Sequence, residues 1–163
     1  MGNRFLAAFG IGLVAVAVAV VVVLYLNRGS HVELTGAFLK VRTAPLDEHS
    51  SVAVVDFRFA NPSDYPFVVR SVTLVLEDAS GRTVDGTSVP ESDTERLFQA
   101  LPLLGQKYNA TLIARDKVAP RTTQDRMIAA RFEVPESALT MRKQFSIRVD
   151  EVDGGVSIIN EKQ

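Results

Sequence analysis

The sequence predicts an all-β protein. We expect an antiparallel β-sandwich of about seven strands with one short helix, preceded by a single N-terminal transmembrane helix. Three observations predict this fold class. Uncharged residues run without interruption from Phe5 to Leu26. Apolar and polar side chains then alternate with a period of two in several segments, as they do in strands with one buried face. Turn signals built from Gly, Asn, Asp and Pro separate these segments.

The uncharged run is the first predicted element. Its 22 residues form a helix of about 33 Å, enough to cross a hydrocarbon core of roughly 30 Å. A cleaved signal peptide is the alternative, but its apolar region is typically only ~7–15 residues and ends in a small-residue cleavage site, whereas LNRGSH follows this run. We therefore predict a tail at residues 1–4, a membrane helix at 5–26 and a linker at 27–31 that reaches at most roughly 18 Å.

The orientation of this helix is weakly encoded. Arg4 precedes the run and Arg28 follows it, so the positive-inside rule gives no clear preference. A short tail, one apolar run and one soluble domain are typical of a signal-anchor. We expect a single-pass protein of the inner (cell) membrane with its C-terminal domain outside the cytoplasm.

Small residues recur on one face of the predicted membrane helix. Such a face lets two membrane helices pack closely, which would give a homodimer. The alternative is that an Ala-rich segment aligns small residues by chance. The candidate packing face consists of Ala8, Gly12, Ala15 and Ala19.

The predicted strands lie between residues 32 and 160, and residues 161–163 form a C-terminal tail. The first strand is expected around Val32–Arg42 and the last at Val156–Ile159. Five further segments alternate between an apolar and a polar face, which is typical of antiparallel sheets packed face to face. Their apolar sets are Val55, Phe57 and Phe59; Val72, Leu74 and Leu76; Tyr108, Ala110, Leu112 and Ala114; Ile128, Ala130, Phe132 and Val134; and Phe145, Ile147 and Val149.

Two hairpins and one helix are predicted between these strands. Ser80-Gly81 and Asp153-Gly154-Gly155 are hairpin signals. Ser92 and Glu95 have the spacing of a capping box, which predicts the start of a helix. Pro102 disfavours helix at the residue before it, so the helix is expected to end at Leu101. We expect one amphipathic helix crossing between the sheets, with Leu97, Phe98 and Leu101 on its apolar side.

The segment NPSDYP joins two of the strands and must be a loop. Its prolines fix φ and lack a ladder donor, and its Asn, Ser and Asp favour turns closed by side chains. We expect the ring of Tyr65 to cover the end of the core, with its hydroxyl in water; the alternative is an exposed contact residue. The candidate interaction loop consists of Asn61, Pro62, Asp64, Tyr65 and Pro66.

Composition excludes several function classes. The 18 basic and 19 acidic residues are interspersed and give a net charge of −1, so no basic stripe indicates nucleic-acid binding. The chain has no cysteine, which excludes disulfides, thiolate nucleophiles and sulfur-ligated metals. His31 lies in the linker, and His49 directly follows Asp47 and Glu48, so these side chains do not converge on one metal. We predict no catalytic, cofactor-binding or metal-binding residue, and no enzyme activity.

Three weaker patterns have ordinary structural explanations. The segment Val149–Gly154 fails the spacing of an EF-hand calcium loop. Asn109 begins a glycosylation sequon, which matters only in a secretory eukaryotic setting. Three arginines in or near the polar segment 119–126 could form an anion-binding patch, but we expect them to be solvated. They are Arg115, Arg121 and Arg126.

The loop and its flanking strands resemble two groups of known domains. The pattern N-P-S-x-x-P-F, a leucine-rich strand and the late element Arg131-Phe132-Glu133-Val134-Pro135 resemble the water-stress (WHy, late-embryogenesis-abundant group 2) domain. They are equally similar to small bacterial anchored immunoglobulin-like domains of the DUF4352 and telokin-like type. The resemblance spans about Val52 to Val152. The Ser92–Leu101 helix and the absence of a lipobox cysteine depart from both patterns. The resemblance implies an immunoglobulin-like sandwich with binding or protective roles.

Three functions fit these observations. The first is a non-catalytic protein-interaction module at the membrane surface, held in the bilayer by residues 5–26, with another membrane or envelope protein as partner. The second is a stress-protective domain of the water-stress type. The third is a ligand-binding carrier with a pocket that sequence does not reveal. No cofactor and no nucleic acid is expected for any of them.

Overall fold

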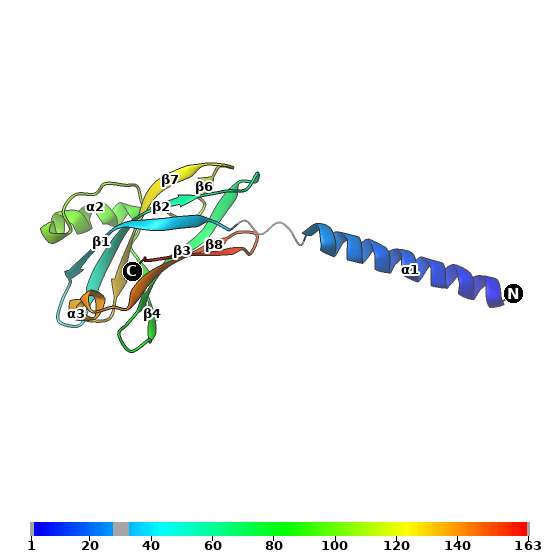
Figure 1. Ribbon diagram of the computed structural model, residues 1–163, viewed down its shortest axis with the longest axis horizontal. Helices are drawn as coiled ribbons and strands as arrows, with labels where there is room; N and C mark the ends of the chain where they lie inside the picture. The colour runs from blue at the N-terminus through cyan, green and yellow to red at the C-terminus, as the bar shows by residue number, and fades with distance from the viewer. Residues whose placement is uncertain (1, 28–32, 163) are drawn as a thin grey trace. The chain divides into compact units, whose positions relative to one another are not determined.

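The chain consists of a helical unit and a β-sandwich unit. A computed structural model describes residues 2–27 and 33–162, and for residues 2–8 and 24–27 it describes the backbone alone. Contacts divide the chain into Met1–His31 and Val32–Gln163. The first unit contains α1 (Gly2–Asn27) (Figure 1). Within the described residues, no helix has the combination of length and apolar character that crossing a membrane requires.

The predicted packing face falls partly within the described residues. Gly12, Ala15 and Ala19 are exposed on α1. The side chain of Ala8 lies outside the described residues, as do linker residues 28–31 with His31.

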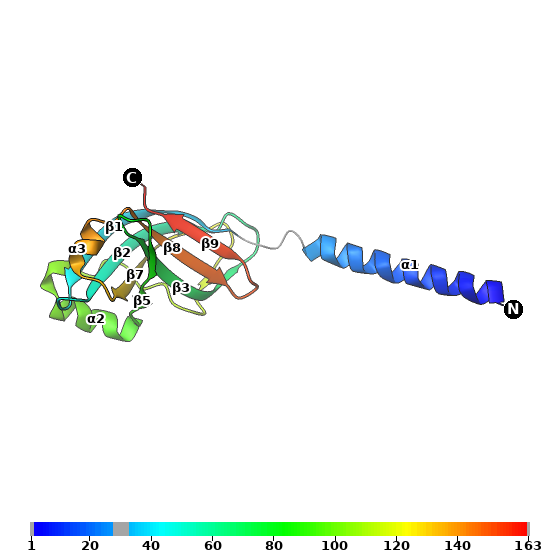
Figure 2. The same ribbon diagram turned by 90° about the horizontal axis from the view of Figure 1, so that it is seen from below.

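Two antiparallel sheets form the second unit (Figures 1 and 2). The first sheet has the order β1 (Thr35–Pro45), β2 (Ser51–Ala60), β7 (Thr123–Phe132) and β5 (Thr87–Ser88). The second has the order β4 (Thr83–Asp85), β3 (Phe67–Glu77), β8 (Gln144–Glu151) and β9 (Val156–Asn160), and β6 (Lys117–Val118) also pairs with β3.

This strand order is consistent with an immunoglobulin-like sandwich. Lettered in chain order, with β4 as C′ and without β6, the sheets have the orders A-B-E-D and C′-C-F-G, which match the orders of immunoglobulin domains. The connection from β4 to β5 passes from one sheet to the other at Gly86. A Cβ at this position would lie 2.6 Å from the Phe132 ring, so the crossing requires glycine.

The inner core lies between the two sheets, as the period-two pattern predicts. All five predicted apolar sets contribute buried side chains to it, four of them through residues such as Phe57, Leu74, Phe132 and Phe145 and the fifth through Leu112 alone. Both predicted hairpin turns are present, between β3 and β4 and between β8 and β9. Gly81 and Gly154 have positive φ in these turns, which explains why glycine is needed there.

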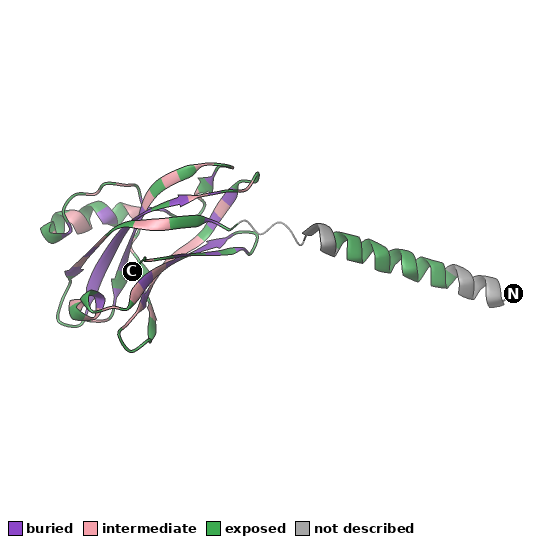
Figure 3. Ribbon diagram, in the orientation of Figure 1, coloured by how far each residue is buried: buried purple, intermediate pink, exposed green. Residues whose placement is uncertain are grey.

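A second, smaller core covers the outer face of the first sheet. Here α2 (Glu91–Ala100) and the 3₁₀ turn η1 (Pro102–Leu104) pack on β1, β2 and β7. Its buried members are Ala44, Val52, Val54, Leu104, Met127 and Ala129, with Val89, Leu97, Phe98 and Leu101 partly buried against them. The expectation that every strand has one wet face is therefore wrong for β2, which is buried on both faces over most of its length (Figure 3).

The predicted strand from Tyr108 to Ala114 is wrong. The chain is irregular there, and Thr111 forms only an isolated bridge with Met127. The backbone of Met127 bonds to Ala110 and Leu112, so this segment and the short β5 cover the edge of β7 in two pieces. The alternation marks one buried side chain, Leu112, rather than a strand.

The predicted helix exists, but the capping box does not form. The helix begins at Glu91 after Pro90, and no side chain caps its N-terminus. The Thr94 hydroxyl donates to the Pro90 carbonyl instead, from inside the first turn. The helix ends at Ala100, ahead of Pro102, as expected. The prediction of one short helix is wrong, because η1 and α3 (Glu136–Thr140) are also present.

Candidate functional site

The loop Asn61–Pro66 connects β2 in the first sheet to β3 in the second. Thr35 pairs with Ala60, so β1 begins beside this loop. The segment that follows β6 also packs here, because the backbone N–H of Asn61 donates to the Thr122 carbonyl at 2.9 Å. Two connections that are distant in sequence therefore meet at this end of the sandwich.

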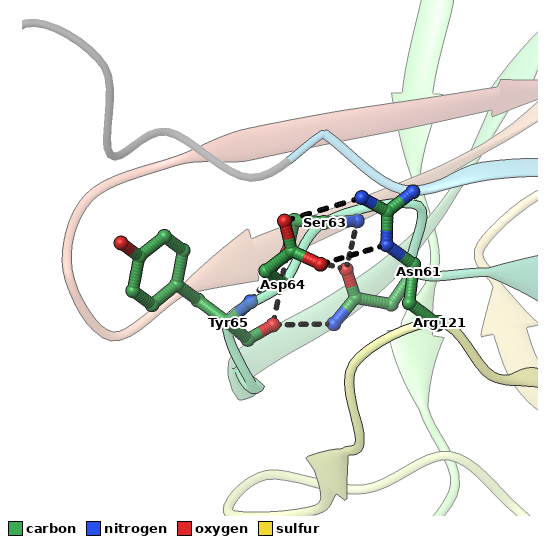
Figure 4. Close-up of polar contacts among 5 residues, drawn as sticks. All are labelled: Asn61, Ser63, Asp64, Tyr65 and Arg121. Carbon is green, nitrogen blue, oxygen red and sulfur yellow. Dashed lines mark hydrogen bonds and ion pairs between the residues drawn. The ribbon is translucent and has the colours of Figure 1, made fainter.

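Asn61 holds the loop from the inside (Figure 4). Its side chain is buried, and its Nδ2 donates to the carbonyls of Tyr65 at 2.7 Å and Val118 at 3.3 Å. Its Oδ1 accepts from the Ser63 amide at 3.0 Å and lies 2.8 Å from the Ser63 hydroxyl. Both ends of one amide are thus satisfied by backbone and hydroxyl groups of the loop and by β6, which fixes the loop conformation.

Arg121 holds the loop from the outside (Figure 4). Its guanidinium donates to both carboxylate oxygens of Asp64, at 2.9 and 3.2 Å, and its backbone amide donates to the Ser63 carbonyl. The hydrogen bonds and charge of Arg121 lower the pKa of Asp64. Arg121 has a φ of 55° and Arg115 a φ of 73°. Residues other than glycine adopt this region at a cost of about 1–3 kcal/mol, and such strain concentrates at functional sites.

Tyr65 is an exposed residue and does not cover the core. Its ring points away from the hydrogen bonds of the loop (Figure 4), and the residue is 69% exposed. Pro62, Asp64 and Pro66 are exposed as well. The structure therefore places the candidate interaction loop at the surface, with one buried member, Asn61, beneath it. We name this arrangement the Asn61 turn.

A second turn is held by a buried ion pair that the sequence analysis missed. Arg42 on β1 and Asp56 on β2 are both buried, and Arg42 Nη2 lies 2.5 Å from Asp56 Oδ2. The Nη1 of Arg42 donates to the carbonyls of Leu104 and Gln106, each at 2.7 Å. Asp56 Oδ1 accepts from Asn109 Nδ2 at 2.8 Å. The pair thus attaches the segment from η1 to Asn109 onto the sheet.

Aromatic rings complete this second arrangement. The Arg42 guanidinium carbon lies 5.1 Å from the centre of the Phe98 ring and 5.3 Å from that of Tyr108, within the range of cation–π attraction. Lys40 contacts the same Tyr108 ring. This segment exposes two large apolar or aromatic residues: Leu103 is 79% exposed and Tyr108 60%. We name this arrangement the Arg42 turn.

The sequence contains a signal for the Arg42 turn. Asp56 interrupts the apolar run SVAVVDF, and period two places it on the polar face of its strand. That face is covered by α2 and η1, so the carboxylate is buried and needs a charged partner. Asn109 also has a structural role here, because its amide is bonded to Asp56 rather than free at the surface.

The remaining candidate residues do not converge. Of the three arginines considered for an anionic patch, Arg121 binds Asp64 and Arg126 donates to Gln124 at 3.1 Å. His49 lies exposed in the turn between β1 and β2, where its backbone amide donates to the Asp47 carboxylate. Over the described residues, no three acidic or imidazole side chains are placed to hold a metal ion.

An open groove of about 520 Å³ lies between β3, the end of β5 and the segment 111–114. Its lining is mainly apolar and includes Val72, Leu112 and Ile128 of the inner core, with Arg70 and Glu91 as its charged members. Burial raises the pKa of Glu91, but hydrogen bonds from Lys107 and from Thr111 outweigh this effect and lower it overall. The buried Thr111 hydroxyl has no partner among the described residues.

Comparison with known proteins leaves the family open. No protein-family model and no curated protein matches the chain. An uncharacterized β-sandwich protein from Clostridium difficile 630 is 11% identical over 82% of this chain and 87% of its own, with a TM-score of 0.39. The archaellum periplasmic stator protein FlaG from Sulfolobus acidocaldarius is 10% identical over 79% of this chain and 98% of its own, with a TM-score of 0.35. The assignment to β-sandwiches therefore depends on the strand order of this chain. The water-stress and DUF4352 resemblance stays a prediction.

Proposed function

We propose that this protein is a non-catalytic interaction module held at a membrane surface. One observation supports this proposal most strongly: large exposed side chains stand on turns that buried polar groups hold in place. Tyr65 stands on the Asn61 turn, and Leu103 and Tyr108 stand on the Arg42 turn. Fixing a contact residue before binding reduces the entropy that association costs. Tyr is enriched among the residues that contribute most of the binding energy at protein interfaces.

Membrane anchoring is the second part of the proposal. The 22 uncharged residues from Phe5 to Leu26 support it. The signal-anchor pattern favours a sandwich outside the cytoplasm, and we propose that side. Alkaline extraction of isolated membranes tests the anchor, since an integral protein stays in the membrane pellet. Protease treatment of a C-terminal tag, in cells with the outer layer opened and in lysed cells, tests the side on which the sandwich lies.

The partner of the Arg42 turn is another membrane or envelope protein under this proposal. A photo-cross-linking phenylalanine derivative at position 103, in native membranes, tests it. We expect one discrete adduct from position 103. The matched control is the same derivative at Arg82, which is exposed in the β3–β4 hairpin. Adducts of equal pattern from both positions, or none from position 103, would contradict the proposal.

A ligand-binding function is the second candidate, because of the groove beside β5. Its volume of about 520 Å³ lies within the range of small-molecule sites, roughly 300–1,000 Å³. Ala114 lines the groove, and Ala79 lies exposed in a hairpin away from its lining. Native mass spectrometry of the purified chain would detect a retained small molecule. A carrier loses that molecule with Ala114→Trp and keeps it with Ala79→Trp.

A further inference from the structure

The end of the sandwich where the chain enters has a distinct surface. It consists of the loop Asn61–Pro66, the segment 113–122 and the turn 152–155, and we name it the entry end. These segments meet around the start of β3: Arg115 donates its amide to the Val69 carbonyl, and Val152 donates its amide to the Val68 carbonyl. The pairing of Thr35 with Ala60 places the start of β1 at the same end.

Large apolar side chains are exposed at the entry end. Tyr65, Ile113 and Val152 each come from a different one of its three segments, and all are exposed. An isolated exposed valine or isoleucine is ordinary on a protein surface. At the entry end, three connections each expose one such residue. Two of these connections are held by buried Asn61 or contain residues with positive φ, Arg115 and Arg121. We interpret this arrangement as a binding surface.

The entry end carries both cations and acids. Arg115 and Lys117 are exposed and form no ion pair with any described residue, whereas the charge of nearby Arg70 acts on Asp150 and helps to lower its pKa. The acids are mostly engaged: Asp64 binds Arg121, and Asp116 accepts from the Ile113 amide at 3.1 Å. Asp153 and Glu33, which lies two residues before β1, are the remaining exposed acids. The entry end therefore offers two cations without an ion-pair partner, Arg115 and Lys117, beside an aromatic ring and two aliphatic side chains.

The chain length limits what this end can meet. Eight residue steps separate Asn27, the last residue of α1, from Thr35, and they span at most about 29 Å. If Phe5–Leu26 crosses a bilayer, as proposed above, the start of β1 stays within about 29 Å of the end of α1, so the entry end can reach the headgroups. Tyr is enriched at membrane–water interfaces, because its ring is amphipathic, and Lys and Arg bind lipid phosphates.

We propose that the entry end rests on the lipid headgroup layer of the membrane that holds the anchor. Tyr65, Ile113 and Val152 enter the interface, and Arg115 and Lys117 bind phosphate groups. This inference depends on the proposed membrane anchoring and names the partner of the Asn61 turn. The Arg42 turn, at the other half of β2, is then free for a protein partner.

Single tryptophan reporters test this placement, because the chain has no tryptophan of its own. The full chain is reconstituted in nanodiscs with and without lipids brominated near the headgroup end of the acyl chain. Three variants are compared: Tyr65→Trp at the entry end, Leu103→Trp on the Arg42 turn and Val21→Trp within the predicted membrane helix. Tyr65 and Leu103 are comparably exposed, so they form a matched pair.

We expect brominated lipid to reduce the emission of Val21→Trp and Tyr65→Trp at least twofold, and to leave Leu103→Trp unchanged. If brominated lipid quenches Val21→Trp but leaves the emission of Tyr65→Trp and Leu103→Trp unchanged, the inference is overturned while the membrane anchor is supported. The entry end would then be available to a protein partner. Equal quenching of Tyr65→Trp and Leu103→Trp would also overturn the inference, because the entry end and the Arg42 turn would then contact the lipid to the same extent. An unquenched Val21→Trp would overturn the anchor and the inference together.

Discussion

The two turns achieve the same result with different chemistry. The Asn61 turn is held by a neutral amide whose partners are backbone carbonyls, a backbone amide and a hydroxyl. The Arg42 turn is held by a buried ion pair whose cation also binds two carbonyls. When a neutral network is broken, polar groups lose a hydrogen bond. When one partner of a buried ion pair is removed, the other is left as an uncompensated buried charge, which costs more. The Arg42 turn should therefore be far more sensitive to substitution, although both expose their contact residues to a similar degree.

Removing one charge of the buried pair should have the largest effect. Arg42→Met leaves the Asp56 carboxylate buried without its partner, and we expect it to lower the free energy of unfolding by about 3–5 kcal/mol. Urea unfolding of the full chain in micelles, followed by far-ultraviolet circular dichroism, measures this loss. The double variant Arg42→Met/Asp56→Leu removes both charges and should recover much of the stability. A double variant as unstable as the single one would show that the charge is not the cause.

Breaking the neutral network should have the next largest effect. Asn61→Ala removes the Nδ2 donor to the Tyr65 and Val118 carbonyls and the Oδ1 acceptor of the Ser63 amide, and we expect a loss of about 1–3 kcal/mol in the same unfolding measurement. Asn160→Ala is the matched control. Asn160 is exposed on β9, and among the described residues its side-chain oxygen accepts from Ser146 alone. Its replacement should therefore change stability by no more than about 0.5 kcal/mol. Equal losses for the two asparagines would contradict the role of Asn61.

The exposed contact residues should matter little for folding. Tyr65→Ser and Leu103→Ser each remove a side chain that is mostly in water, so we expect changes in stability within about 0.5 kcal/mol. Leu103→Ser should nevertheless weaken capture of the protein partner, and Tyr65→Ser should reduce contact with lipid. Leu104→Ala is the matched comparison for Leu103, since Leu104 is its fully buried neighbour. We expect Leu104→Ala to destabilise the chain by about 2–5 kcal/mol.

The ion pair on the outside of the Asn61 turn should have the smallest effect, visible only as a pH dependence. Arg121 lowers the pKa of Asp64 below its unfolded value of about 3.9. The unfolded state then binds more protons between these two pKa values, so this contribution is full above about pH 4 and is lost as the pH falls through the folded pKa. Because the pair is exposed, we expect only a small decrease in the urea midpoint from pH 6 to pH 3. Arg121→Gln should reduce that decrease, and an unchanged decrease would show that other acids cause it.

Much of the sandwich can be predicted from the sequence, because its inner core follows period two. The sets around Phe57, Leu74, Ile128 and Ile147 all face inward as expected. The prediction fails where a second layer covers a sheet. By its position in the alternation, Asp56 should be exposed to solvent, but it is buried under η1. The packing of η1 on the sheet is a tertiary contact, which the alternation of a single strand does not encode. The Tyr108–Ala114 segment fails for the same reason, because one buried leucine in an irregular segment looks like alternation.

In the candidate site too, contacts between neighbouring residues can be predicted from the sequence and contacts between distant residues cannot. Local chemistry predicts the Asn61 turn, since Asn, Ser and Pro in NPSDYP act on their own neighbours. The contact with Arg121 joins residues that lie 57 positions apart, and no local pattern indicates it. The Arg42 turn is wholly nonlocal, because its carbonyls come from η1 and its two charges from β1 and β2.

Hydrogen exchange measured on the two turns tests the central claim most directly, namely that separate buried groups hold them. The amides of Leu104 and Gly105 donate to the carbonyls of Leu101 and Pro102, and the Ser63 amide donates to Asn61. In Arg42→Met/Asp56→Leu, we expect the Leu104 and Gly105 amides to exchange at least tenfold faster than in the unmodified chain. The Ser63 amide should keep its rate. Unchanged exchange at Leu104 and Gly105, or equal acceleration at Ser63, would contradict the account.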